Sequence, residues 1–172
     1  MKKGFSLIEL MIVIVIIGVV YTLAITKLKT VGEEKVKPSL ANLKEYLLSV
    51  DKEAEETRFL CLDDCSECSV YTDGKKVQSM KSFFDSSIET YTYNFLQGTN
   101  EVKDALFFNK EGNEENVCFS LNVTKDGIAD QYLVVYKDKT YDYTLAFEKT
   151  KVYDFLEEAV EAKQKMAQEV MQ

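Results

Sequence analysis

Hydrophobic residues dominate the start of the chain, from Phe5 to Ile25. Four residues interrupt this run: Ser6, Glu9, Gly18 and Thr22. As an α-helix with a rise of ~1.5 Å per residue, the segment would be roughly 30 Å long, the thickness of the hydrocarbon core of a bilayer. Lys2 and Lys3 precede it, and basic residues favour the cytoplasmic side of a membrane. The pattern therefore predicts a transmembrane helix over residues 5–27, with the rest of the chain outside the cytoplasm.

A second helical pattern covers residues 28–58. Its apolar positions are spaced by three and four residues: Val36, Leu40, Leu43, Leu47, Val50 and Ala54. We expect it to continue the first helix, with a kink or break between Gly32 and Pro38 because proline removes an intrahelical hydrogen bond. Arg58 is expected at the C-terminus of this helix, where a cation is favourable. The sequence thus predicts one long N-terminal helix whose outer half packs on a domain.

The pattern changes to a period of two in the second half of the chain. After a turn at Asp73 and Gly74 and a short helical candidate over residues 77–85, aromatic and β-branched residues mark five strands. These strands are predicted over residues 89–96, 105–109, 117–123, 131–137 and 141–147. The links between them are short and turn-like, as antiparallel neighbours require. Residues 59–150 are therefore predicted to form a globular head with an antiparallel sheet.

The last segment, residues 151–172, again has apolar residues at helical spacing, with glutamates and lysines between them. It predicts a C-terminal amphipathic helix. Two interpretations remain for its apolar face: packing against the protein's own sheet, or docking to another subunit or an assembly component in the manner of a helix in a groove.

Charge and composition exclude several classes of function. The net charge is −8, from 21 basic and 29 acidic residues. Because proteins bind nucleic acid by neutralising phosphates with lysine and arginine, direct binding of nucleic acid is not expected. The chain contains no histidine, which excludes catalytic triads that need it and histidine-containing metal sites. We expect no enzymatic activity, no cofactor and no metal.

Glu9 is unusual because an ionisable group within a membrane segment is costly and by default needs a partner. A cut between Gly4 and Phe5 would supply one. It would remove both lysines at the start of the chain and create an α-amino group four residues before Glu9, about one helical turn away. The carboxylate could then meet that amine, in its own chain or in a neighbour.

These residues resemble the N-terminal signal of bacterial type IV pilins and type II secretion pseudopilins. In that resemblance, Gly4 precedes the cut by a prepilin peptidase, Phe5 becomes the N-methylated terminus, and Glu9 pairs with the terminal amine of an adjacent subunit. It implies residues 1–4 as a leader peptide. Many major pilins carry a proline where this chain has Thr26, so the departure favours a minor pilin or a pseudopilin. An ordinary secretory signal and an uncut membrane anchor are the alternatives for this segment.

The resemblance also implies a fold, partners and a location. The fold is an α+β, type IV pilin-like fold, in which a long N-terminal transmembrane helix packs on an antiparallel β-sheet; the C-terminal helix is an addition to the common pattern. The implied partners are other pilin or pseudopilin subunits, prepilin peptidase, an inner-membrane assembly platform and membrane lipid. The implied location is the bacterial inner membrane, single-pass with the head in the periplasm, and then a pilus or pseudopilus.

The four cysteines are Cys61, Cys65, Cys68 and Cys118. Their spacing is compatible with zinc, but outside the inner membrane the compartment is oxidising, which favours two disulfides. The sequence leaves all three connectivities open.

The sequence therefore predicts a structural subunit, a minor pilin or pseudopilin of a type IV pilus or type II secretion-like filament, assembled through its N-terminal helix. The alternative is a membrane-tethered or secreted periplasmic ligand-binding protein. In that case the tyrosine-rich sheet would be the ligand surface and residues 5–25 only an anchor or signal.

Overall fold

The computed structural model describes residues 7–31, 37–103, 106–108 and 112–170. The chain divides into two compact units, Met1–Lys37 and Pro38–Gln172, and we call the second unit the head. Each unit is described by itself.

The first unit contains helix α1, Leu7–Val31. Large apolar side chains between Leu7 and Tyr21 are exposed along this helix. Within the residues that the structure describes, none of the helices combines the length and the apolar character that a membrane crossing requires. The transmembrane helix predicted over residues 5–27 is therefore not confirmed. The expected break between Gly32 and Pro38 falls largely outside the described residues.

The helix predicted over residues 28–58 requires correction. Helix α1 ends at Val31, helix α2 covers only Leu43–Val50, and strand β1 begins at Glu56. Two turns of α2 suffice to bury Leu43 and Leu47, both fully inaccessible to solvent. At Asp51 the backbone becomes extended, and β1, which buries Phe59, Leu60 and Cys61 in succession, pairs with two neighbouring strands. Strand pairing thus overrides the helical spacing of the apolar residues.

Arg58 accordingly does not close a helix. It lies in β1 and its Nε donates a hydrogen bond to Asn122 Oδ1 on the adjacent strand, while its guanidinium pairs with Glu56 at 3.4 Å. The arginine therefore joins two strands of one sheet.

The first sheet has five antiparallel strands in the order β3-β2-β1-β7-β6. Their bounds are Glu56–Leu62 for β1, Glu67–Thr72 for β2, Lys75–Lys81 for β3, Leu106–Phe108 for β6 and Glu114–Thr124 for β7. Strand β3 replaces the helix expected over residues 77–85. Asp73 and Gly74 have φ values of 48° and 74°, which form a tight reversal and return the chain to pair with β2.

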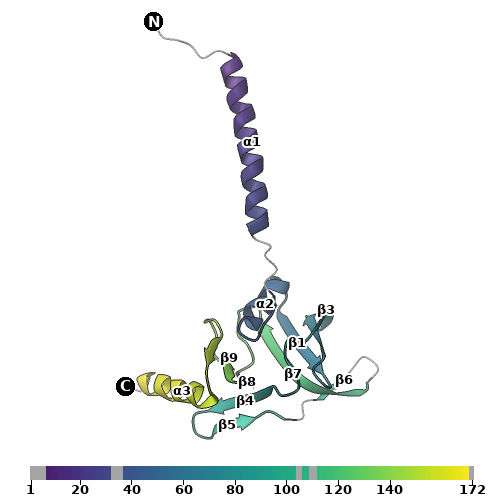
Figure 1. Ribbon diagram of the computed structural model, residues 1–172, viewed down its shortest axis with the longest axis vertical. Coiled ribbons are helices and arrows are strands. Elements are labelled where there is room, and N and C mark those ends of the chain that lie inside the picture. The colour runs from purple at the N-terminus through teal and green to yellow at the C-terminus, as the bar shows by residue number, and fades with distance from the viewer. Residues whose placement is uncertain (1–6, 32–36, 104–105, 109–111, 171–172) are drawn as a thin grey trace. The chain divides into compact units, whose positions relative to one another are not determined.

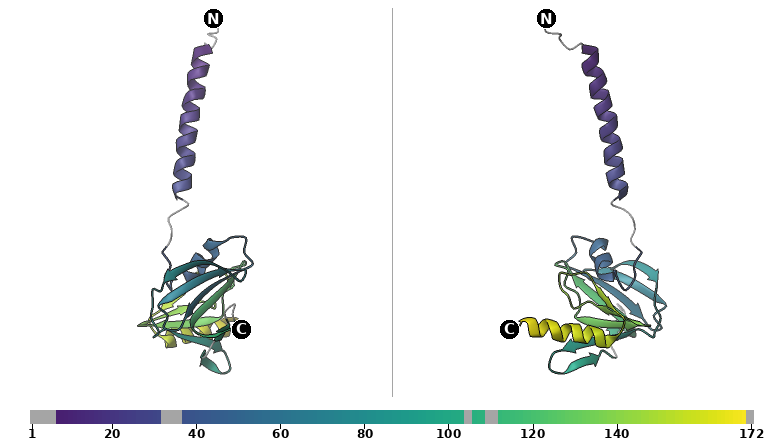
Figure 2. Two further views of the ribbon diagram at one scale, coloured as in Figure 1. Left: turned by 90° about the vertical axis from the view of Figure 1, so that its right-hand side faces the viewer. Right: turned by 60° about the vertical axis from the view of Figure 1, so that its left-hand side comes forward.

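The second sheet, also antiparallel, has the order β10-β9-β8-β4-β5. Its strands are β4 Glu89–Asn94, β5 Gly98–Glu101, β8 Tyr132–Tyr136, β9 Lys139–Asp142 and β10 Lys151–Tyr153. The head thus contains two sheets where the sequence predicted a single meander (Figure 1). The C-terminal helix is present as α3, Leu156–Val170, and contacts β8, β9 and β10 (Figure 2).

One hydrophobic core joins α2 to both sheets. Its centre is a group of edge-to-face rings, in which Phe84 lies 5.2 Å from Phe119 and 6.3 Å from Phe59 between ring centroids. Leu121 from the first sheet and Val134 from the second complete it. The fold is therefore α+β with antiparallel sheets and a C-terminal helix, and the short α2 is the helix that contributes residues to the core shared by both sheets.

Candidate functional site

The predicted processing residues Gly4 and Phe5 lie outside the described residues. Glu9 lies in the first turn of α1, and the structure describes its backbone but not its side chain. The roles predicted for these three residues stay predictions.

The predicted disulfides are present, and the structure gives their connectivity. Cys61 and Cys68 are bonded across directly opposed positions of β1 and β2, with their Cα atoms 4.1 Å apart. Cys65, in the loop between these strands, is bonded to Cys118 of β7, 53 residues further along the chain. A zinc site would need these sulfurs as thiolates, and all four are in disulfides. The two bonds together fasten three neighbouring strands at one end of the first sheet.

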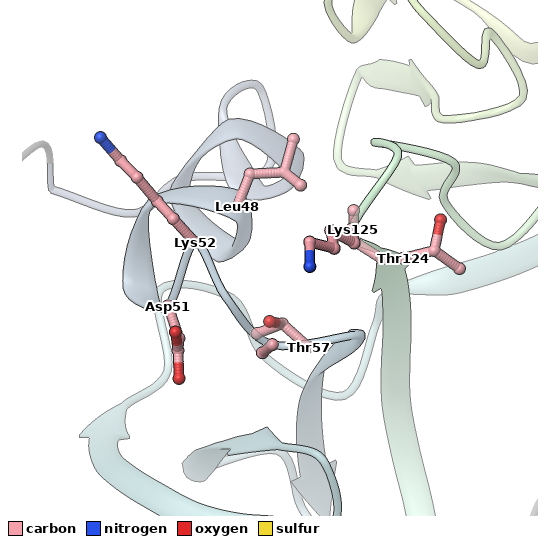
Figure 3. Close-up of a pocket in the computed structure, with 8 residues that line it drawn as sticks. Leu48, Asp51, Lys52, Thr57, Thr124 and Lys125 are labelled. Carbon is pink, nitrogen blue, oxygen red and sulfur yellow. The ribbon is translucent and has the colours of Figure 1, made fainter.

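A pocket of about 320 Å³ lies between α2 and the adjoining ends of β1 and β7. Figure 3 shows Lys52 pointing away from Lys125, so the two ammonium groups do not converge on one point. Lys125 is engaged instead by Glu55 at 3.2 Å. The lining residues include neither a nucleophile paired with a base nor a pair of facing carboxylates. This pocket therefore gives no support for catalysis.

Two polar contacts hold the segment after β9 against α2. Lys44, which is 4% exposed, donates hydrogen bonds through Nζ to the carbonyl oxygens of Leu145, Ala146 and Glu148 at 2.8, 3.1 and 2.6 Å. Burial lowers the pKa of Lys44, partly offset by nearby carboxylates. Tyr143, also buried, donates to the carbonyl oxygen of Leu40 at 2.5 Å, and burial raises the pKa of its hydroxyl. The loop after β9 is thus held in a defined conformation.

Helix α3 is attached through a buried ion pair. Lys163 Nζ lies 2.7 Å from Asp142 Oδ2, and the two side chains are 10% and 0% exposed. Lys163 also donates to the hydroxyl of Thr144. Asp142 Oδ1 accepts hydrogen bonds from the backbone N–H and hydroxyl of Thr144 at 2.9 and 2.7 Å. At the start of the helix, Glu158 accepts a hydrogen bond from the backbone N–H of Asp154 at 3.0 Å. These contacts support packing of α3 on its own sheet.

The tyrosines do not form a common ligand surface. Tyr143 is in the core, Tyr132 and Tyr141 pack against the core, and Tyr91 donates to Glu89 at 2.7 Å. That hydrogen bond, with burial and nearby carboxylates, raises the pKa of Tyr91 to about 12. The tyrosines that would form the ligand surface of a ligand-binding protein are therefore divided between the core and separate surface contacts.

Sequence reasoning did not identify Lys44, Asp142 or Lys163 as residues of interest. One signal was available for Lys44. The sequence places it among the polar residues of the predicted helix, but it directly follows Leu43 and borders the apolar stripe, where a lysine must either extend to solvent or find buried acceptors. Asp142 and Lys163 gave no comparable signal, because their pairing depends on the unpredicted docking of α3 on β9.

Comparison with known proteins identifies the N-terminus. Residues 1–25 match the prokaryotic N-terminal methylation motif. This motif is the signature of type IV pilins and pseudopilins, and the chain carries it. No curated protein and no solved structure matches the chain. The match covers the N-terminal motif alone and supports a type IV pilin-like or pseudopilin precursor.

Proposed function

We propose that the protein is a non-enzymatic subunit, a minor pilin or pseudopilin, of a type IV pilus or type II secretion-like filament. The observation that carries this proposal is the methylation motif over residues 1–25. The head supports it in a second way. Its tightly fastened strands and the absence of convergent catalytic groups around the pocket beside α2 suit a structural unit.

In this proposal a prepilin peptidase cuts between Gly4 and Phe5 and the new terminus is methylated. Loss of Lys2 and Lys3 changes the net charge from −8 to −10. Glu9 then neutralises the terminal amine of a neighbouring subunit, since an unpaired charge within a bundle of apolar helices is costly. The carboxylate thereby governs register and entry into the filament.

The same proposal places residues 5–27 in the inner membrane and the head in the periplasm until assembly. The apolar sequence of this segment and the lysines before it support the arrangement. The two disulfides of the head are compatible with an oxidising compartment. An inner-membrane assembly platform and membrane lipid are the further partners.

The decisive experiment is intact-mass and N-terminal analysis of the protein from native membranes, with and without reductant. We expect a terminus at methylated Phe5 and a gain of about 4 Da on reduction, two hydrogens for each disulfide. A terminus near Ile25 would indicate a secreted protein, and an intact Met1 would indicate a simple anchor. Either result would overturn the proposal.

A matched pair of glycine variants tests the position of the cut. Gly4→Val is expected to retain Met1 because a branched side chain would stand next to the scissile bond. Gly18→Val is the control: apart from the helix's own neighbouring backbone, a Cβ atom added at Gly18 meets no described atom within 4 Å. Normal processing of the Gly4 variant would contradict the proposed cut.

Glu9→Gln tests the role of the carboxylate with little change in shape. We expect normal processing, since the cut lies five residues away, and a loss of roughly tenfold or more in sedimentable filament, since a neighbour's amine would be left unpaired. Glu157→Gln, an exposed change in α3, is the control. Filament yield equal to wild type would overturn the role of Glu9.

A further inference from the structure

Phe147 is an exposed aromatic side chain on a firmly held loop. It is 84% exposed. The carbonyl groups on both sides of it, those of Leu145, Ala146 and Glu148, accept hydrogen bonds from the buried ammonium of Lys44. Because these acceptors satisfy a buried charge, the loop cannot rearrange to cover the ring without leaving that charge unsatisfied. The exposure of Phe147 is therefore a fixed property of this surface.

An apolar recess of about 280 Å³ lies beside Phe147, between α2 and the turn after β7. Leu48, Ala146 and Gly127 contribute to its lining. Gly127 has a φ of +79°, and a Cβ atom there would lie 3.6 Å from Leu48 Cδ1, so a side chain at this position would narrow the recess. We call Phe147 and this hollow the Phe147 recess. It has room for an apolar side chain of a partner.

Carboxylates dominate the rim of the Phe147 recess. Glu45, Asp126 and Glu148 lie there, and Lys149 is the exposed lysine among them. One oxygen of Glu45, Oε2, is buried and has no hydrogen-bond partner among the described residues. A buried carboxylate oxygen without a partner is costly, and a cation would satisfy it. The surface therefore suits an apolar residue flanked by basic ones.

The chain itself contains such a segment. Lys27, Leu28 and Lys29 follow one another near the end of α1, Leu7–Val31. In the sequence, this segment places one apolar residue directly between two basic ones. We propose that the Phe147 recess receives Lys27–Lys29 of a second copy of this chain. The inference rests on the proposed function, because a filament brings copies together, and a contact of this head-to-helix kind repeats from each copy to the next.

Photo-crosslinking in the full chain tests this contact. Phe147→p-benzoylphenylalanine is introduced into the full-length protein, which is irradiated in native membranes and in filaments. We expect a product with twice the mass of the chain, in which position 147 is joined to the peptide containing Lys27–Lys29. The matched control carries the same residue at Leu96, which is 89% exposed on the turn between β4 and β5, and should not reach that peptide. A crosslink within one chain, to another protein or to another surface of the second copy would overturn the inference, as would no crosslink.

Charge reversal in the same system separates electrostatic recognition from chance proximity. Lys27→Glu with Lys29→Glu should lower the dimeric product roughly three- to tenfold, as expected for the loss of two ion pairs. Adding Glu45→Lys and Asp126→Lys to that variant should restore the yield of the dimeric product. Lys75→Glu with Lys76→Glu, on strand β3, makes the same change of charge elsewhere and should have no effect. An unchanged yield in the first variant would contradict the proposed pairing.

The N-terminal analysis keeps the two proposals separate. A processed, methylated Phe5 with no crosslink to Lys27–Lys29 overturns only the contact at the Phe147 recess. An unprocessed or differently cut terminus overturns the filament proposal, and this inference with it.

Discussion

Helices α2 and α3 each use a buried lysine to fasten a segment of the head, but the partners differ. In α2, Leu43 and Leu47 are fully buried, and Lys44 binds three backbone carbonyl groups. In α3, Ala159 is the fully buried residue of the described helix, and Lys163 binds the carboxylate of Asp142. Hydrophobic burial thus holds α2, and its lysine organises the loop that crosses it. The ion pair of Lys163 with Asp142 is the buried polar contact of α3.

The folded core of the head depends on α2 more than on α3. Two leucines at 0% exposure belong to the core that joins both sheets, so α2 cannot leave without opening that core. Among the described residues, α3 contributes none to that core cluster, so it can leave its sheet while the core stays intact. We therefore expect changes in α2 to act on the whole head, and changes in α3 to act locally.

Leu47→Ala should have the largest effect on the whole head. It removes buried atoms from the core and leaves a cavity, which costs about 2–5 kcal/mol. The measurement is urea unfolding of the full-length protein in detergent, followed by tyrosine fluorescence. Val160→Ala, which removes a half-buried side chain from α3, should cost less than about 1 kcal/mol. Equal losses in the two variants would remove the distinction between the helices.

Lys163→Met should release α3 while leaving the core folded. Removal of one partner of a buried pair costs about 3–5 kcal/mol if the other partner stays buried, and detachment of the helix lets Asp142 reach water instead. Hydrogen exchange should therefore accelerate at least about tenfold in α3 and remain unchanged in β7. Lys165→Met, an exposed change in the same helix, is the control. Unchanged protection in α3 would show that apolar contacts alone hold it.

Tyr143→Phe should have an intermediate effect. It deletes the hydrogen bond to the carbonyl oxygen of Leu40, and a net loss of about 0.5–1.5 kcal/mol follows from an unsatisfied buried acceptor. Tyr46→Phe deletes an exposed hydrogen bond to Gln78 and should cost less. The comparison uses the same urea unfolding. A Tyr143 variant as stable as the Tyr46 variant would mean that water donates a hydrogen bond to the carbonyl oxygen of Leu40 in place of the tyrosine.

The pH dependence from Lys44 should be the smallest effect. Burial lowers the pKa of Lys44 from its ordinary 10.5, so the unfolded chain holds this proton more tightly than the folded one. Stability contributed by Lys44 therefore rises with pH between the lowered pKa and 10.5. Relative to Lys44→Met, the wild type should gain stability as the pH increases from about 8 to about 10.5. Tyr143 ionises in both proteins, so its effect cancels. A difference that shrinks with pH would contradict the assignment.

The sequence predicted the elements whose signal is local. The period of two over residues 117–123 and 131–137 corresponds to β7 and β8, and the helical spacing after residue 151 corresponds to α3. The methylation motif was recognisable because it depends on residue types at fixed positions, as the match over residues 1–25 shows. The even number of cysteines predicted disulfides for a chemical reason that does not require the fold.

The remaining features depend on contacts distant in the sequence. The stretch that contains Phe59 has apolar residues compatible with either a helix or a strand, and its pairing with β2 and β7 decides the outcome. The division into two sheets follows from the same pairing. The connectivity of Cys65 with Cys118 and the pairing of Asp142 with Lys163 likewise appear only when separate elements are brought together.

The bond between Cys65 and Cys118 has a mechanical consequence. In the proposed filament, a subunit would be loaded through its chain, and a covalent bridge between these residues removes the segment between them from the path of tension. With a separation of 53 residues and about 3.3–3.6 Å of extension per residue, roughly 180 Å of chain cannot be drawn out while the bond is intact. A head that unfolds under load would therefore extend by less than the full contour length of its chain. The strands joined by the disulfides would stay together for refolding.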